Sequence, residues 1–164
     1  KGGALWAARF FFRIALLEKK RPAPRHFGAT HTVNAAQQDA QTAVQSWTAG
    51  RGVDYAFVAV GSTNAVNQAF HLIRPGGALV LVGLPEVSAC VPLNVHHFWY
   101  ERRVIGSPLG STRLSVDVPH WVELYQQGRL KLDELVTRCY PLNEINEAIA
   151  AMERGEALRN VIVF

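Results

Sequence analysis

AFHLIRPGGALVLVGLP, residues 69–85, contains the end of a helix, a Pro-Gly-Gly stop signal and an apolar strand in direct succession. Four apolar residues recur at helical spacing and predict one buried helix face: Val66, Ala69, Phe70 and Ile73. Ser62 or Thr63 precedes that face and can cap the helix, whereas the Pro-Gly-Gly at 75–77 stops it. The run at 78–84 then predicts a strand, and this succession is typical of an α/β protein.

The same alternation of short β-rich runs and amphipathic stretches extends from residue 29 to the end of the chain. Helical crossovers that join parallel strands produce this order, so we expect an α/β fold with a doubly wound parallel sheet. VDYAFVAV, at 53–60, is almost continuously apolar and is therefore predicted as a buried central strand covered on both faces. The other expected strands are 30–34, 78–84, 102–107, 135–142 and 160–164.

Three further helices are predicted from apolar residues at i, i+3, i+4 and i+7. The first ends at Gly50 and carries its stripe on Ala40, Ala43, Val44 and Trp47. Asp117 is expected to cap the second, which ends at Gly128 and carries Val118, Trp121, Val122 and Tyr125. Asn143 is expected to cap the third, which ends at Gly155 and faces inward with Ile145, Ala148, Ile149 and Met152.

The amino-terminal segment, residues 1–25, departs from this regularity and is expected to be irregular or truncated. RIALLEKKRPAPRHFGATHTV, at 13–33, reads like the second strand and following helix of a dinucleotide-binding unit, but Pro22 and Pro24 would each cost about 3 kcal/mol inside a helix. The glycines at 2–3 lie too close to that strand for a first strand and its crossover helix, because a βαβ unit needs roughly 30 residues. We therefore expect a sheet without its first strand and, since the first residue is not Met, a sequence that begins inside a longer protein.

The formal net charge of +4 and the sequence pI near 9.4 raise the question of nucleic-acid binding. The basic residues form one local run, Lys19, Lys20, Arg21 and Arg25, without an RNA-binding aromatic signature or helix-turn-helix spacing. We therefore expect a solvated basic face and no nucleic-acid partner. The apolar segment at 4–17 resembles a targeting peptide, but it is shorter than the roughly 20 residues of a membrane span, so no membrane association is expected.

Cysteine and histidine usage gives no sign of a metal site. Cys90 and Cys139 lack the paired spacing of a zinc site and the density of a disulfide-rich secreted domain. They fit a reducing compartment, and the predicted location is cytoplasmic. The six histidines are dispersed, and the adjacent His96 and His97 cannot both face one ion comfortably, so no metal site is expected in this chain.

Three glycine-containing turns are the candidate ligand-binding positions: VGST at 60–63, VGLP at 82–85 and GSPLGS at 106–111. In a doubly wound sheet the ligand lies beyond the carboxyl ends of the strands, which is where these turns fall. Glycine beside small residues lets a ligand approach backbone amides closely. Taken singly, each of these segments is more often only a turn.

Four segments, in order and at the right spacing, resemble the carboxyl-terminal half of zinc-dependent medium-chain alcohol dehydrogenases: GRGVDYAFVAVGS, AFHLIRPGGALVLVGLP, ERRVIGSPLGS and GRLKLDELVTRCYPLNEINEAIAAMERGEALRNVIVF. The resemblance spans residues 26–164 and is closest to the glutathione- or mycothiol-linked formaldehyde dehydrogenase branch. It implies a partial Rossmann-type NAD-binding domain at 26–108 and, at 109–164, a carboxyl-terminal segment that returns to the catalytic domain. The implied reaction is hydride transfer to NAD from an alcohol or a thiol-aldehyde adduct.

The resemblance also implies positions that contact the cofactor. Two groups flank the nicotinamide. The first, Val82, Gly83 and Leu84, matches a strand end whose backbone lies against the nicotinamide amide, and the second, Ser107, Pro108 and Leu109, matches the segment that lines its other side. Arg159 matches an arginine that reaches the pyrophosphate, and Lys20 matches a lysine near the adenosine ribose. The plain alternatives are a buried strand end for the first two groups and a solvated surface charge for the last two residues.

Several family features are absent from the matching positions. The acidic residue that would bind the ribose hydroxyls falls on Ala15, with Glu18 three positions late, and Val58 stands where relatives usually have an acid. The catalytic zinc ligands of the family match no residue of this chain, so no catalytic residue is assigned. We expect a fragment that binds NAD(H) weakly or not at all and is inactive alone.

Two alternatives stay open at the level of sequence. LIRPGGALVLVG, at 72–83, also resembles the late strand of S-adenosylmethionine-dependent methyltransferases, which usually close with an antiparallel strand pair. A non-catalytic remnant could instead form a homodimer, because the family's strand matching 102–107 lies at a sheet edge and pairs with a second subunit.

Overall fold

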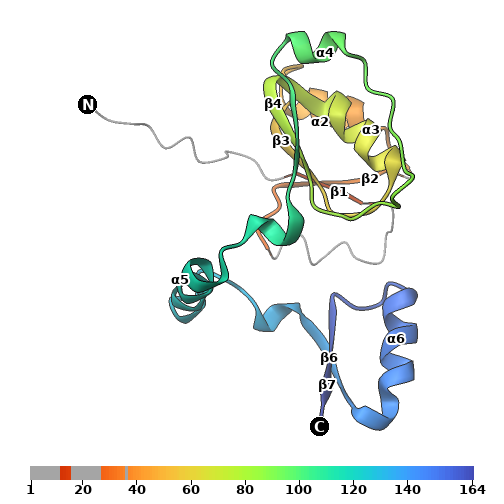
Figure 1. The fold of residues 1–164 in the computed structure, drawn as a ribbon. Coiled ribbons are helices and arrows are strands. Elements are labelled where there is room, and N and C mark those ends of the chain that lie inside the picture. Colours follow the sequence, from red (N-terminus) through yellow and green to blue (C-terminus); the bar gives the residue numbers. More distant parts are fainter. Residues whose placement is uncertain (1–11, 16–26, 36) are drawn as a thin grey trace. The chain divides into compact units, whose positions relative to one another are not determined.

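The structure is a computed structural model that describes residues 12–15, 27–35 and 37–164 (Figure 1). The chain divides into two units, one of residues 37–112 and one of residues 1–36 together with 113–164. All strand pairs in the described ranges are parallel, which confirms the predicted α/β class with parallel strands. No helix among the described residues combines the length and the apolar character that crossing a bilayer requires.

The unit of residues 37–112 is built on a three-stranded sheet in the order β3-β4-β5. Its strands are β3 (Val53–Val58), β4 (Ile73–Leu81) and β5 (Arg103–Gly106). Val58 lies opposite Leu81, and Leu81 lies opposite Gly106, so the three strands end in register. The turns that follow them therefore leave the sheet at the same side, where all three strands finish. This side is called the carboxyl edge below.

Two capped helices precede β3 and β4 in this unit: α2 (Ala40–Trp47) and α3 (Thr63–Leu72). Asp39 caps α2, because its carboxylate accepts hydrogen bonds from the Thr42 amide at 2.8 Å and from the Thr42 hydroxyl at 2.6 Å. Ser62 caps α3 by accepting a hydrogen bond from the Ala65 amide at 3.4 Å, as the sequence predicts.

The core of this unit forms where α3 packs on β3 and β4. Phe70 of α3 is completely buried. Around it lie Ala56, Val58, Ile73 and Leu79, each less than 9% exposed. Burial of one large apolar side chain stabilises the folded state by roughly 1.5–3 kcal/mol, so this cluster holds the helix on the sheet.

The prediction that VDYAFVAV is a central strand covered on both faces is wrong for the described sheet. β4 is the middle strand, and β3 lies at one side of it. β3 buries Ala56 and Val58, but the alternate side chains Tyr55 and Phe57 are 60% and 66% exposed. An apolar run alone does not separate a strand with two covered faces from a strand with one.

The Pro-Gly-Gly segment at 75–77 belongs to β4 and does not reverse the chain. The pairing with β3 jumps from Val53 opposite Ile73 to Tyr55 opposite Ala78, so four residues of β4 bulge out against a single residue of β3. Ile73 is consequently the first residue of β4 and not the last residue of the helix face. The strand ends at Leu81 instead of continuing to residue 84.

The strand pairs of the other unit are described separately. β1 (Phe12–Ala15) pairs with β2 (His31–Asn34), and its last residue is Ala15, the position that the resemblance matches to the family's ribose-binding acid. β6 (Val136–Pro141), α6 (Ile145–Glu153) and β7 (Arg159–Val163) form a β-α-β unit whose two strands pair in parallel. The side-chain amide of Asn160 donates to the Ala148 carbonyl at 2.8 Å and ties β7 to α6.

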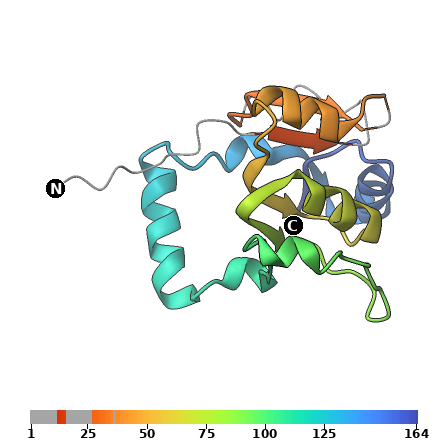
Figure 2. The same cartoon turned by 90° about the horizontal axis from the view of Figure 1, so that it is seen from above.

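The predicted helix caps of this unit are wrong in position. α5 (Leu114–Gln126) has Arg113 at its N-cap and runs continuously through Pro119 (Figure 2). The Asp117 carboxylate, one turn inside the helix, reaches back and accepts a hydrogen bond from the Arg113 amide at 2.6 Å. Asn143 lies in a short 3₁₀ turn, Leu142–Glu144, that leads into α6, and its side chain does not cap the helix.

The inward face of α6 also differs from the prediction. Ala148 and Ala151 are buried, whereas Ile145, Ile149 and Met152 are 40%, 44% and 63% exposed. The pair β6–β7 is only two strands wide, and it covers the small-residue side of the helix. The larger side chains of Ile145, Ile149 and Met152 project from the part of α6 that these two strands do not cover.

A group of rings surrounds Phe70 where α4 (His96–Trp99) meets α3. The Phe70 ring centroid lies 5.8 Å from that of His97 and 5.4 Å from that of Phe98. The Arg102 guanidinium NH1 lies 3.0 Å from His97 Nδ1, and because a guanidinium only donates, this contact requires a neutral imidazole with Nδ1 as acceptor. Partial burial is the main cause that lowers the pKa of His97 below its usual 6.5, and the positive charge of Arg102 adds to it.

We expect the chain to lose stability as the pH falls below about 6.5, because the unfolded chain then binds a proton at residue 97 before the folded chain does. Above that pH, His97 is neutral in both the folded and the unfolded chain, so it does not make the free energy of unfolding depend on pH. H97Q keeps an acceptor for Arg102 and removes the titration, so this part of the pH dependence should disappear. Urea unfolding between about pH 5 and pH 8 measures the effect.

The matched control for this experiment is H96Q, which replaces the exposed neighbouring histidine. It should retain the wild-type loss of stability at low pH. An equal loss of stability at low pH in the wild-type chain and in H97Q would contradict the assignment to His97.

Candidate functional site

The turns after β3, β4 and β5 are joined by main-chain hydrogen bonds. The amides of Val82 and Gly83 both donate to the Val58 carbonyl at 2.9 Å. The amide of Ser107 donates to the Leu81 carbonyl at 2.8 Å. The carboxyl edge of the sheet therefore carries three linked turns, at the place where a parallel sheet binds ligands.

Gly61 and Gly83 allow the first two turns to touch main chain to main chain. A Cβ on Gly83 would lie 2.4 Å from the Val60 carbonyl carbon, and a Cβ on Gly61 would lie 2.4 Å from the Leu84 carbonyl oxygen. Both distances are too short for any side chain. The sequence argument assigned these glycines to ligand approach, whereas the structure uses them for the contact between the two turns.

The third turn, Pro108–Ser111, has a backbone conformation that the sequence indicates at one residue only. Leu109, Gly110 and Ser111 have φ angles of 47°, 73° and 54° in succession. Left-handed backbone is costly for residues with a Cβ. The Thr112 hydroxyl donates to the Leu109 carbonyl at 2.6 Å and helps to hold this conformation. Gly110 was the one signal for it in the sequence.

Apolar side chains project from the linked turns. Leu84 and Leu109 are 93% and 94% exposed, and Val82 is 45% exposed. The Val82 and Gly83 amides are bonded to Val58 and are not available to a ligand, whereas these exposed side chains are. An exposed apolar surface of this kind suits contact with a flat ring such as nicotinamide, so the residues present fit that end of NAD.

The other residues considered for the cofactor do not belong to these turns. Arg159 is the first residue of β7, in the other unit, where it is exposed and lies opposite Val136. Lys20 and Glu18 lie outside the described residues. Val58, which stands where relatives have an acid, is 5% exposed and belongs to the core.

The residues that the structure describes do not fit a zinc ion. Zinc is held by three or four nitrogen, sulfur or carboxylate ligands at about 2.0–2.3 Å. In the described ranges, no three side chains of His, Cys, Asp or Glu come together in such a group. Cys90 and Cys139 are both free and exposed.

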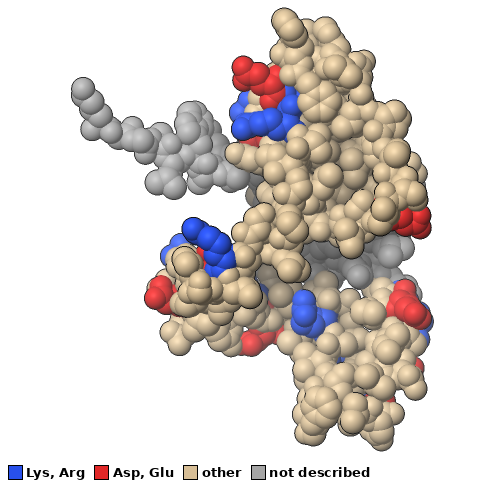
Figure 3. Space-filling view, in the orientation of Figure 1, with Lys and Arg blue, Asp and Glu red and all other residues tan. Residues whose placement is uncertain are grey.

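The charged residues are distributed in small groups. On the face shown in Figure 3, basic and acidic side chains lie beside one another over each part of the chain. The basic run at 19–25 lies outside the described residues.

Comparison with known proteins identifies the family. The sequence model described as "Zinc-binding dehydrogenase" matches residues 10–127. The chain belongs to the zinc-binding dehydrogenase family. It is 33% identical to alcohol dehydrogenase 1 of Oryza sativa subsp. indica, over 99% of this chain and 43% of that protein. It is 35% identical to the NDMA-dependent alcohol dehydrogenase of Amycolatopsis methanolica, over 88% of this chain and 40% of that protein.

Solved structures of members of this family have the same fold as the chain. Benzyl alcohol dehydrogenase from Acinetobacter calcoaceticus matches 95% of the chain with a TM-score of 0.89 and 27% identity, over 43% of its own length. An alcohol dehydrogenase zinc-binding domain protein from Burkholderia ambifaria matches with a TM-score of 0.87 and 26% identity, over 94% of the chain and 41% of its own length. The chain thus spans less than half the length of these relatives. The formaldehyde dehydrogenase branch is not singled out by them and stays a prediction.

We expect G83A to destabilise the unit of residues 37–112, because the added methyl group would collide with the Val60 main chain. Overpacking of this kind costs about 1–3 kcal/mol, and separation of the turns should also expose the Val82 amide. Urea unfolding measures the free energy, and hydrogen exchange measures the Val82 amide. G106A is the control, since a Cβ there would meet no atom within 4 Å. Equal stability of G83A and G106A would contradict the close contact between the turns.

Proposed function

We propose that this chain is the NAD-binding part of a zinc- and NAD-dependent alcohol dehydrogenase. Residues 26–108 would form a partial cofactor domain, and residues 109–164 would return to the catalytic domain. The observation that carries the proposal is the carboxyl edge of the sheet, where linked turns after adjacent strands present apolar side chains in a chain of the zinc-binding dehydrogenase family.

In this proposal the chain positions the nicotinamide. Val82 and Leu84 contact one side of the ring, and Leu109, held in its left-handed turn by Thr112, contacts the other. These apolar groups orient the ring and exclude water from it. Bound NAD would accept a hydride from an alcohol. The described residues provide no zinc ligand set, so the chain as it stands is expected to show no dehydrogenase turnover.

This chain offers fewer contacts to the adenosine and pyrophosphate part of NAD than to the nicotinamide. Ala15 ends β1 at the position of the family's acidic residue and cannot accept hydrogen bonds from the ribose hydroxyls through its side chain. Arg159 and Lys20 are proposed as contacts to the pyrophosphate and ribose on the strength of the resemblance alone. Affinity for NADH should therefore be low.

We expect NADH to bind with a dissociation constant weaker than about 10 µM. In a titration followed by NMR, the amides of residues 82–84 and of Leu109 should shift, and L109D should weaken binding at least about tenfold by placing a carboxylate on the ring-facing surface. V87D is the control, because Val87 is fully exposed in a loop of the same unit. Low-micromolar binding, or equal affinity of L109D and V87D, would contradict the proposal.

The free edge of β5 favours a second function, homodimerisation through residues 102–107. Among the described residues β5 pairs with β4 alone, and Ile105 is 45% exposed. Because the Ser107 amide donates to β4 and successive amides alternate in direction, the Val104 amide points toward the free edge. An edge with unpaired amides and carbonyls is a template for a second strand, and a two-fold axis would pair β5 with its own copy.

We expect the chain to elute as a dimer in gel filtration and I105K to shift it toward the monomer, because lysine on an edge strand opposes strand addition. I149K is the control, since Ile149 is similarly exposed, at 44%, but belongs to helix α6 and not to a strand. A wild-type chain that stays monomeric at all concentrations would rule out this interface.

A further inference from the structure

One long side of strand β3 has no partner among the described residues. β3 pairs with β4 alone, and its other long side, here named the free edge of β3, faces away from β4. The Val58 carbonyl accepts hydrogen bonds from the segment after β4, and successive residues of a strand direct their main-chain groups to alternate sides. Ala56 and Val58 therefore bond to β4. The N–H and C=O groups of Tyr55 and Phe57 point to the free edge, where no described strand meets them.

The side chains of the same two residues form an exposed apolar surface. Tyr55 and Phe57 are 60% and 66% exposed. Their ring centroids lie 6.4 Å apart, and their ring planes make an angle of 28°. Unpaired main-chain groups and uncovered rings therefore occur together, and a strand added at the free edge would meet both.

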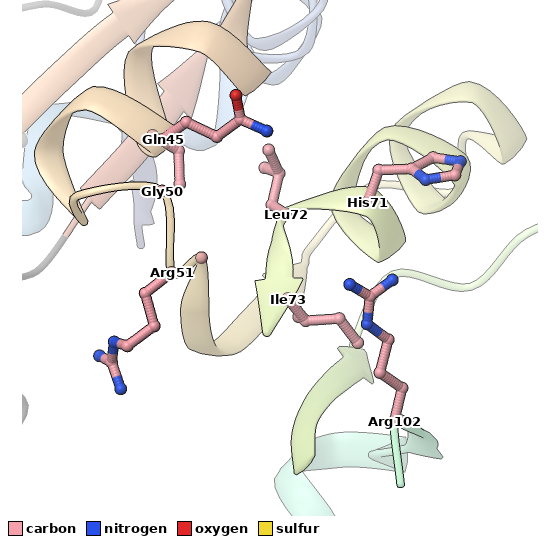
Figure 4. Close-up of a pocket in the computed structure, with 9 residues that line it drawn as sticks. Gln45, Gly50, Arg51, His71, Leu72, Ile73 and Arg102 are labelled. Atoms are coloured by element: carbon pink, nitrogen blue, oxygen red, sulfur yellow. The ribbon is translucent and has the colours of Figure 1, made fainter. Parts of the chain in front are cut away.

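The charged groups next to β3 lie at its amino end and are paired. The Asp54 carboxylate accepts hydrogen bonds from Arg51 at 3.1 Å and from Arg74 at 2.6 Å. Figure 4 shows the small cavity at this end of the sheet, where the Arg51 side chain extends away from Ile73, the first residue of β4. From Tyr55 to Val58 the strand carries no charge. A segment that adds beside this stretch should therefore be uncharged.

The free edge of β3 also lacks the features that protect exposed edge strands. Such strands usually carry a charged side chain, a proline or a bulge that opposes further pairing. The stretch from Tyr55 to Val58 contains none of these, and the bulge opposite Asp54 belongs to β4, on the other side of the strand. β5, the other outer strand of the sheet, begins with Arg103. β3 therefore has the composition of a strand with a neighbour on each side.

The order of the strands indicates which segment fits this edge. A doubly wound sheet places its first strand between the second and the fourth, with all strands parallel. The described strands divide at that point of the order, because β1 pairs with β2 whereas β3 begins a separate sheet. The chain spans less than half the length of its relatives, so polypeptide that has no counterpart in these residues makes up most of those proteins. A parallel strand from another polypeptide therefore matches the free edge of β3 in direction and in position.

We propose that the free edge of β3 binds an extended, uncharged apolar segment of another polypeptide, which adds to the sheet as a strand parallel to β3. Main-chain hydrogen bonds to Tyr55 and Phe57 supply the affinity, and alternate apolar side chains of the added segment cover the two rings. The interaction is independent of the proposed NAD contacts, because it involves none of the turns at the carboxyl edge.

The direct test adds a synthetic peptide to the wild-type chain and measures amide hydrogen exchange by NMR. The peptide is ALVLV, the sequence of residues 78–82, with two lysines at its carboxyl end for solubility, because β3 already pairs in parallel with this stretch of β4. In the chain alone, the amides of Ala56 and Val58 should exchange slowly and those of Tyr55 and Phe57 rapidly. The peptide should slow exchange at Tyr55 and Phe57 by at least about tenfold and leave the other two amides unchanged.

Three outcomes of this experiment would overturn the proposal. The first is unchanged exchange at Tyr55 and Phe57 in the presence of the peptide, or equal protection by the peptide ALPLV, whose proline removes a main-chain donor. The second is slow exchange of both amides in the chain alone at every concentration, because the edge would then already be covered. The third is protection that grows with chain concentration without peptide, which would assign the edge to a second copy of the chain.

The direction of the added strand is tested with a nitroxide spin label on the peptide. A label at its amino end should broaden the amide signals around Val53, and a label at its carboxyl end should broaden those around Val60. The reverse pattern would show antiparallel addition and overturn the parallel arrangement.

Two variants locate the peptide. F57K should weaken peptide binding by at least about tenfold, as measured by isothermal titration calorimetry, because it removes one ring and places a charge on the edge strand. V87K should retain affinity within about twofold, because Val87 is fully exposed in a loop and belongs to no strand. Equal loss in both variants would overturn the assignment to the free edge of β3. If F57K does not fold, hydrogen exchange in the wild-type chain decides the matter.

Discussion

The contact between the turns after β3 and β4 determines the geometry of the whole carboxyl edge. One carbonyl, that of Val58, accepts hydrogen bonds from two successive amides, and the absence of a side chain at Gly61 and Gly83 lets the two main chains meet. Neither turn can move without the other. The direction in which Val82 and Leu84 project is therefore fixed by main-chain contacts, and the side chains themselves remain free to be exposed for binding.

The two ends of the three-stranded sheet have opposite chemical character. At the carboxyl end, the amides of Val82, Gly83 and Ser107 are bonded within the protein, and apolar side chains are exposed. At the amino end, arginines gather, and one acid, Asp54, is shared between two of them, while Arg102 lacks a carboxylate among the described residues. A sheet with parallel strands can separate groups of different character in this way, because the two ends of its strands lie a full strand length apart.

Apart from the short helix α4, which was not predicted, the order of the longer helices and of the strands after residue 29 was predicted correctly, because that order depends on local periodicity. Ser62 as a helix cap follows from such a local rule. The errors arise where tertiary contacts decide. Whether Tyr55 and Phe57 are covered depends on what lies over β3, and whether 75–77 turns or bulges depends on how β4 pairs with its neighbour.

The candidate site was only partly accessible from sequence for the same reason. The turns at the strand ends could be named, because the position of a ligand in a parallel sheet follows from topology. The left-handed conformation of Leu109 could not, since leucine gives no signal for it. The contacts of Arg102 with His97 and Phe70 could not be predicted either, because they depend on how α3 and α4 meet.

The parallel pairing of the strands has a consequence for how the chain reaches its native state. A hairpin can close over two residues, but none of the described pairs is a hairpin, and β5 can join β4 only after the chain from residue 82 to residue 102 has folded back across the sheet. Closure of such crossovers costs conformational entropy before the contacts repay it, so parallel sheets form slowly. During that delay the edges and apolar faces of β3 and β4 stay open to other chains. The yield of correctly folded protein therefore depends on the temperature and concentration at which the polypeptide is made, independently of how stable the finished fold is.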